Sequence, residues 1–142
     1  MDTVKLFELR LLELDPRDDS FPLEVDSLVS SVPSELHADL IGAIFRFFEK
    51  YPLEDCGAPG TLVHFVEHYY PAYKSVLLCS LASSPSINAL LLLHRILNSE
   101  LTTGERSEYL DALSQVAHRT DIHATLVRRA EGFVDYQNRK GR

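Results

Sequence analysis

Apolar residues recur every three or four positions along most of the chain, which is the spacing of one helix face. Residues 4–14 also fit a strand, but their Leu, Glu, Lys and Arg content favours a helix. No other segment alternates convincingly with period two, so we expect an all-α fold. The helices predicted are 4–14, a short one within 23–32 after the turn-rich linker 15–22, and 33–51, 61–70, 72–82, 86–98, 103–117 and 121–137.

The short connections between these segments predict a compact domain of about seven or eight antiparallel helices. We expect a single domain over 1–142, with 138–142 a frayed basic tail. Residues 87–97 are apolar nearly all round, which predicts a central helix. The segments 72–98 and 103–137 look like two helical hairpins about 33 residues apart, the size of an α-solenoid repeat, which leaves a solenoid-like second half open.

Three local signals concern helix starts. Thr102 and Glu105 have the spacing of a capping box, which predicts a helix beginning directly after Thr102. Thr120 or Asp121 is expected to cap the last helix. Gly60 precedes the helix at 61–70, and we expect it to need a positive φ in the turn before that helix.

Composition places the chain among globular proteins, with 142 residues, 45% hydrophobic and 25% charged. Its net charge of -7 has the wrong sign for neutralising phosphates, which argues against a direct nucleic-acid partner. Acidic residues interrupt the first thirty positions, and no apolar run approaches the ~20 residues of a membrane span. We therefore expect a cytoplasmic protein without a membrane partner. Cys56 and Cys79 lack CxxC spacing and are expected to be free thiols.

The negative charge is concentrated in residues 1–55, which hold thirteen acids and five bases, against eight acids and nine bases in 56–142. The excess of acids in this half of the chain could attract a basic partner and speed its association. Alternatively, the acids could serve only as a solvated surface. The candidate partner-binding acids are Asp15, Asp18, Asp19, Glu24, Asp26, Glu35, Asp39, Glu54 and Asp55.

The clearest chemical motif is His64-Phe-Val-Glu67-His68, the HxxEH pattern of inverted zinc proteases, in which two histidines one turn apart bind metal. Such an enzyme also needs a third ligand and a substrate cleft. The alternative is a polar stripe of Thr61, His64 and His68, available to a partner and opposite Leu62, Phe65, Val66 and Tyr69. No nucleophile elbow or phosphate loop is present, so we expect neither enzymatic activity nor a metal or cofactor.

Several stretches carry a family resemblance: 57–67 (Gly-Ala-Pro-Gly-Thr-Leu-Val-His-Phe-Val-Glu), 73–80, 88–98, Arg106 and Tyr109-Leu110. In these the chain resembles the small all-helical bacterial immunity proteins encoded beside secreted polymorphic or contact-dependent growth inhibition toxins. The resemblance covers roughly residues 33–135 and is most specific in the Pro-Gly turn that leads into Leu-Val-His-Phe-Val-Glu. It implies a protein that covers the active or substrate-binding surface of one cognate toxin, and it implies no catalytic residues.

An acidic inhibitor suits a basic target, and a nuclease toxin must carry Lys and Arg to hold phosphates. Carboxylates of the inhibitor could occupy those phosphate sites, so we expect the toxin to be a nuclease. Two other functions remain open at this point: a helical adaptor for another protein, and a small HxxEH metal-dependent hydrolase.

Overall fold

The computed structural model describes residues 2–56 and 60–140, and every regular element in those ranges is helical. This confirms the all-α prediction. None of the helices in the described ranges is long and apolar enough to cross a membrane. The elements in chain order are α1 (Thr3–Leu12), α2 (Phe21–Ser30), the 3₁₀ helix η1 (Ser34–Leu40), α3 (Ile41–Lys50), α4 (Thr61–Glu67), α5 (Lys74–Ser83), α6 (Ile87–Leu97), α7 (Thr103–Ala117) and α8 (Ala124–Lys140).

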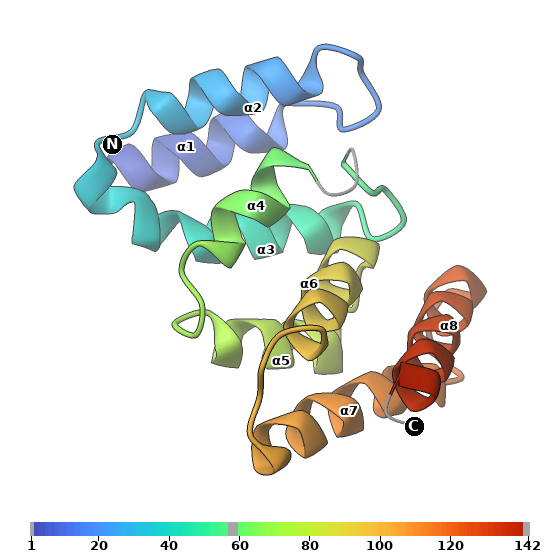
Figure 1. Cartoon of the computed structure of the whole chain (residues 1–142). Helices are drawn as coiled ribbons and strands as arrows, with labels where there is room; N and C mark the ends of the chain where they lie inside the picture. The colour runs from blue at the N-terminus through green and yellow to red at the C-terminus, as the bar shows by residue number, and fades with distance from the viewer. Residues whose placement is uncertain (1, 57–59, 141–142) are drawn as a thin grey trace.

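The first half of the chain is built on the antiparallel hairpin of α1 and α2 (Figure 1). α1 packs on η1 and α3, while α2 contacts α4. α1 buries Phe7 and Leu11, whereas α2 buries Phe21 and Val25, as their helical spacing requires. The Phe21 ring stacks on Phe47 of α3 with centroids 5.7 Å apart, which ties the hairpin to the layer beneath it.

The second half consists of two helical hairpins, α5–α6 and α7–α8. α5 packs against α7, and α6 packs against both α7 and α8. The two hairpins therefore lie against each other, with α8 at the outer end of the molecule (Figure 1). This is the stacked arrangement that the 33-residue offset in the sequence indicates.

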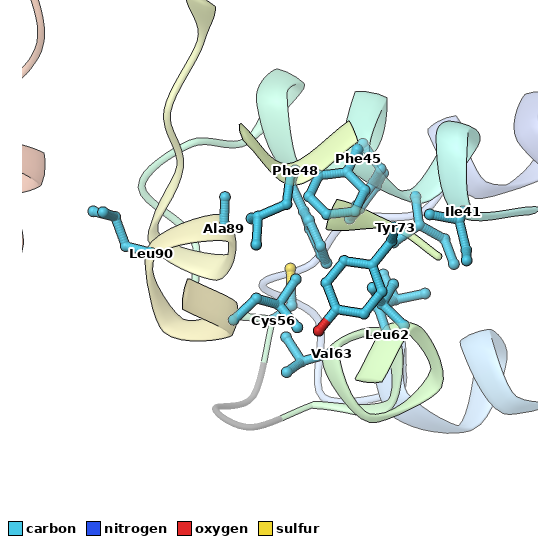
Figure 2. Close-up of a cluster of buried hydrophobic side chains, with 14 of the residues drawn as sticks. Ile41, Phe45, Phe48, Cys56, Leu62, Val63, Tyr73, Ala89 and Leu90 are labelled. Carbon is cyan, nitrogen blue, oxygen red and sulfur yellow. The ribbon is translucent and has the colours of Figure 1, made fainter. Parts of the chain in front are cut away.

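α6 is the central helix, as its apolar sequence predicts. It contacts α3, α4, α5, α7 and α8, and residues on nearly all its sides are buried. Figure 2 shows the core where α3, α4 and α6 meet, with the Tyr73 ring lying among apolar side chains of α3 and α4. The labelled members of this cluster are Ile41, Phe45, Phe48, Cys56, Leu62, Val63, Tyr73, Ala89 and Leu90.

The start of α6 is tied to the segment that follows α3. The buried Asn88 amide donates to the Glu54 carbonyl over 2.9 Å, and its nitrogen lies 3.4 Å from the Cys56 sulfur. Cys56 is buried and Cys79 is exposed, and both are free thiols as predicted.

The single helix predicted over 33–51 is wrong, because two helices occupy that range. Residues Ser34–Leu40 form the 3₁₀ helix η1, opened by a bond from the Leu36 N–H to the Pro33 carbonyl, and α3 begins only at Ile41. The His37 imidazole Nε2 lies 2.8 Å from the Val32 carbonyl, which ties η1 to the residue before Pro33. Periodicity alone does not separate 3₁₀ from α-helix over so short a segment.

The boundaries predicted around Pro71 also differ from those observed. The helix predicted over 61–70 ends at Glu67, and α5 begins at Lys74 instead of residue 72. Turns occupy the intervening residues, because Pro71 has no backbone N–H to donate and so cannot continue the helix.

Both ends of the last helix depart from prediction. Helix α8 begins at Ala124 instead of residue 121, so neither Thr120 nor Asp121 is its cap. Asp121 pairs with Arg119, and the His123 Nδ1 accepts from the Thr125 N–H over 3.0 Å at the helix start. Helix α8 continues to Lys140, so 138–140 of the expected frayed tail are helical, while 141–142 lie outside the described residues. Gln137 is buried and holds this end in place.

The capping box of Thr102 and Glu105, at the start of α7, is confirmed.

Candidate functional site

Three of the predicted acids are exposed near the start of α2 with their carboxylates free. Asp18 and Asp19 lie in the loop before α2, and Asp26 lies on α2 itself. Their side chains make no hydrogen bond or ion pair with residues in the described ranges. These three charges are therefore available to a basic partner.

Asp15, in the same loop, is already paired. It accepts from the Arg17 backbone N–H over 2.9 Å and from the Arg17 Nε over 3.0 Å. The hydrogen bond from the Arg17 side chain is the largest cause that lowers the pKa of Asp15. Asp15 thus shapes the loop and contributes less free charge than its neighbours do.

Leu23 is the most exposed large apolar side chain in the described part of the protein, at 75% exposure. It points away from the buried Phe21 and Val25, because two residues along a helix is a rotation of about 200°. Leu23 also lines a hollow of about 510 Å³ between α1 and α2. The other lining residues are Arg10, Glu13, Leu14, Ser20, Glu24, Ser27, Leu28 and Ser31.

We call Leu23, Asp18, Asp19 and Asp26, together with this hollow, the α1–α2 surface. Sequence reasoning identified its acids but missed Leu23. The signal was present, since Leu23 falls outside the stripe formed by Phe21, Val25 and Leu28. An exposed apolar side chain within an acidic surface can act as the anchor of a protein interface.

The remaining acids of the predicted group lie elsewhere. Glu35 and Asp39 are exposed on η1, at the opposite end of the α1–α2 hairpin from the loop that carries Asp18 and Asp19 (Figure 1). Glu54 and Asp55 follow α3, at the end nearer that loop. Arg17 of that loop senses the charge of Glu54. The pKa of Arg17 is raised chiefly by its hydrogen bond with Asp15, and the charge of Glu54 raises it further. The structure therefore divides the acids between two ends of the hairpin.

The polar stripe forms part of a second hollow, of about 550 Å³, lined by six residues of η1, α4 and the turn after it. His64 and His68 are exposed there, and Thr61 is half-buried. The six lining residues are His37, Thr61, His64, Phe65, His68 and Tyr69.

Two features of this hollow differ from the predicted stripe. Phe65 and Tyr69, expected on the opposite face, are half-buried and line the same hollow as the histidines. His37 comes from η1, with its ring centroid 5.4 Å from that of Phe65. Nothing in the local sequence links His37 to His64, because only packing brings the two helices together.

Glu67 of the HxxEH motif contacts the His64 and Arg95 side chains. Its carboxylate lies 3.2 Å from the His64 Nδ1 and 2.5 Å from the Arg95 Nε. Glu67 thus connects α4 to α6 as an ion-pair partner. Within residues 2–56 and 60–140, no group of three or more His, Cys, Asp or Glu side chains is arranged to hold a metal ion.

The turn before α4 departs from prediction at Gly60. Gly60 has φ -86° and ψ 178°, an extended conformation open to any residue, so the expected positive φ is wrong. The preceding residues 57–59, including the proline of the Pro-Gly turn, lie outside the described residues. The positive φ in this region belongs to Cys56, at 56°.

Comparisons with known proteins identified no similar protein. A scan against protein-family models, a search of curated proteins and a search of solved structures each found no match.

Proposed function

We propose that this chain is a cytoplasmic immunity protein that binds a cognate secreted toxin domain and covers its active or substrate-binding surface. The observation that carries the proposal is the α1–α2 surface, where Leu23 is 75% exposed beside a hollow, with Asp26 three residues along the same helix and Asp18 and Asp19 in the loop before it. The all-helical fold agrees with the resemblance to immunity proteins of toxin systems.

The chemistry of this surface favours a basic protein partner. An apolar side chain that fills a pocket supplies affinity, while surrounding charges steer the encounter and fix the orientation. A nuclease exposes Lys and Arg where it holds phosphates, and the carboxylates of Asp18, Asp19 and Asp26 would take the place of those phosphates. We therefore propose a nuclease domain as the toxin.

The first test is protection. The protein encoded by the gene next to this chain, which the proposal expects to end in a toxin domain, is expressed in bacteria with and without the chain, and survival is counted. We expect survival only when the chain is present, and a purified complex of the two proteins. Death in both cultures, or no such complex, contradicts the proposal.

The second test locates the interface by binding kinetics at low and high salt. We expect Asp15, Asp18, Asp19 and Asp26 changed together to Lys to slow association, mostly at low salt, because long-range steering is lost. We expect Leu23→Ala to speed dissociation by about fivefold or more, the loss of roughly 1 kcal/mol at an interface anchor.

The chain offers a control of the same kind for each variant. Glu35→Lys with Asp39→Lys reverses charges at the other end of the hairpin, and Val76→Ala shortens an apolar side chain that is 37% exposed on α5. Both controls are expected to bind like the wild type. If His64→Ala with His68→Ala weakens binding and the α1–α2 variants do not, the partner docks on the histidine hollow instead.

A further inference from the structure

The outer face of α8 bears a basic hollow that the proposed function does not use. Its volume is about 510 Å³, and all but one of its lining residues come from one face of α8. The exception is His94 of α6. The residues that line this α8 hollow are His94, Thr125, Arg128, Arg129, Gly132, Phe133, Tyr136 and Arg139.

Three aromatic rings meet at the α8 hollow. The His94 and Phe133 rings stack with centroids 4.1 Å apart and planes 8° from parallel, and Tyr136 meets His94 edge-on at 5.1 Å. Tyr136 is 45% exposed, so much of its ring remains available to a ligand. Burial, and to a smaller extent the charge of Lys140, lowers the pKa of His94.

Arg128, Arg129 and Arg139 supply the charge of the α8 hollow. All three are exposed, and none forms an ion pair or hydrogen bond with the described part of the chain. The planar guanidinium group matches the geometry of phosphate oxygens and can also stack on an aromatic ring. Three uncompensated arginines in one hollow therefore favour a phosphorylated ligand.

Gly132 lies on the same face of α8 and is not required there by helix packing. Apart from its chain neighbours and the nearby backbone of α8 itself, a Cβ atom built at Gly132 meets no atom within 4 Å. Glycine within a helix lowers helix stability relative to alanine, so this position gives up stability without a packing contact that needs it. Its effect is to leave open the hollow between the arginines and the aromatic rings.

We propose that the α8 hollow binds a nucleotide, with its base stacked on Tyr136 and its phosphates held by the arginines. A base supplies the flat ring that an aromatic and guanidinium lining accepts, and one or two phosphates match the available charge. The net charge of -7 on the whole chain disfavours a long polyanion, so the ligand is a free mononucleotide and not a nucleic acid strand.

Calorimetric titration of the full chain with ADP tests this site. We expect saturable 1:1 binding, at least tenfold tighter than binding of adenosine alone or inorganic phosphate alone, because only ADP engages both parts of the hollow. The ten-nucleotide strand dA10 is expected to bind more weakly than ADP. No saturation by millimolar ADP, or tighter binding of dA10, overturns the proposal.

Gly132→Leu separates binding from folding. Its side chain enters the hollow while leucine favours the helix, so we expect ADP affinity to fall at least tenfold with an unchanged or higher Tm. Arg129→Gln should also weaken ADP binding, whereas Arg10→Gln, the same change on α1, should not. Wild-type affinity in Gly132→Leu, or an equal loss in Arg10→Gln, overturns the assignment. Because Leu23→Ala leaves the α8 hollow intact, ADP binding is tested independently of the proposed immunity function.

Discussion

Leu23 and Leu11 demonstrate how the same residue type has opposite roles on neighbouring helices. Leu11 of α1 is fully buried, whereas Leu23 of α2 is 75% exposed. We expect Leu11→Ala to lower the free energy of unfolding by about 2–5 kcal/mol through lost burial and a cavity. Leu23→Ala should change it by less than about 0.5 kcal/mol, as at an ordinary surface position. Urea unfolding measures both, and a large loss in Leu23→Ala would mean that Leu23 packs in the core.

The two cysteines should differ sharply in reactivity. Burial raises the pKa of Cys56 to about 11, and a thiol reacts as its thiolate. Cys79 is exposed on α5. With iodoacetamide at pH 8 we expect mass spectrometry to find Cys79 alkylated and Cys56 intact until the protein is unfolded. The Cys79→Ser variant should stay unmodified, and rapid labelling of that variant would contradict the buried position of Cys56.

At the scale of elements, an ion pair joins α1 to α3. The Glu8 carboxylate lies 2.5 Å from the Arg46 Nε and 2.9 Å from its Nη2, and this hydrogen bonding is the main cause that lowers the pKa of Glu8. A carboxylate whose pKa is lower in the folded state stabilises the fold above its unfolded pKa. That contribution is lost as the pH falls through the folded pKa.

This linkage predicts a particular pH dependence. The stability difference between the wild type and Glu8→Gln should be constant above pH ~5 and shrink as the pH falls towards ~3. Urea unfolding at a series of pH values measures it. Glu13→Gln, which removes a carboxylate without a partner among the described residues, is the control and should show no such trend. A difference that grows on acidification would reverse the assigned sign.

The end of α8 depends on a buried polar network. The Gln137 Oε1 accepts from the Arg106 Nη2 over 3.1 Å, and its Nε2 donates to the Asn98 Oδ1 over 2.9 Å. Gln137→Ala removes both of these bonds, while Lys140 Nζ still donates to the Asn98 Oδ1 and Arg106 Nη1 to the Leu97 carbonyl, and losing the two bonds should cost about 1–3 kcal/mol. Hydrogen exchange should also quicken in the last turns of α8. Asn138→Ala, at an exposed neighbouring position, should have neither effect, and equal effects would remove Gln137 from this role.

At the scale of the whole molecule, contacts cross between the two halves. The Tyr70 hydroxyl, in the turn after α4, lies 3.2 Å from that of Tyr109 on α7, the Ser80 hydroxyl of α5 donates to the Glu49 carboxylate of α3 over 2.7 Å, and α6 packs on helices of both halves. We therefore expect urea unfolding to give coincident curves by far-UV circular dichroism and tyrosine fluorescence. Two separated transitions would mean that the stacked hairpins of the second half unfold independently, as in a solenoid.

The sequence by itself determined the helical class and the elements with strong local signals. The central helix at 87–97 and the start after Thr102 were both predicted, because periodicity and capping act between residues at most four positions apart. Predictions were less accurate where local signals competed, as at η1 and at the end of α8, which Gln137 holds through contacts with distant residues.

Only the tertiary structure decided which surface residues come together. It separated Asp18 and Asp19 from Glu35 and Asp39, although all belong to one acidic stretch of sequence. It also placed His37 beside α4, and His94 beside the α8 arginines more than thirty residues away. The physical reason is that successive residues of a helix are rotated by about 100°, so the sequence alone shows which residues share a face of one helix. Which helices lie side by side depends on how their buried faces pack against each other.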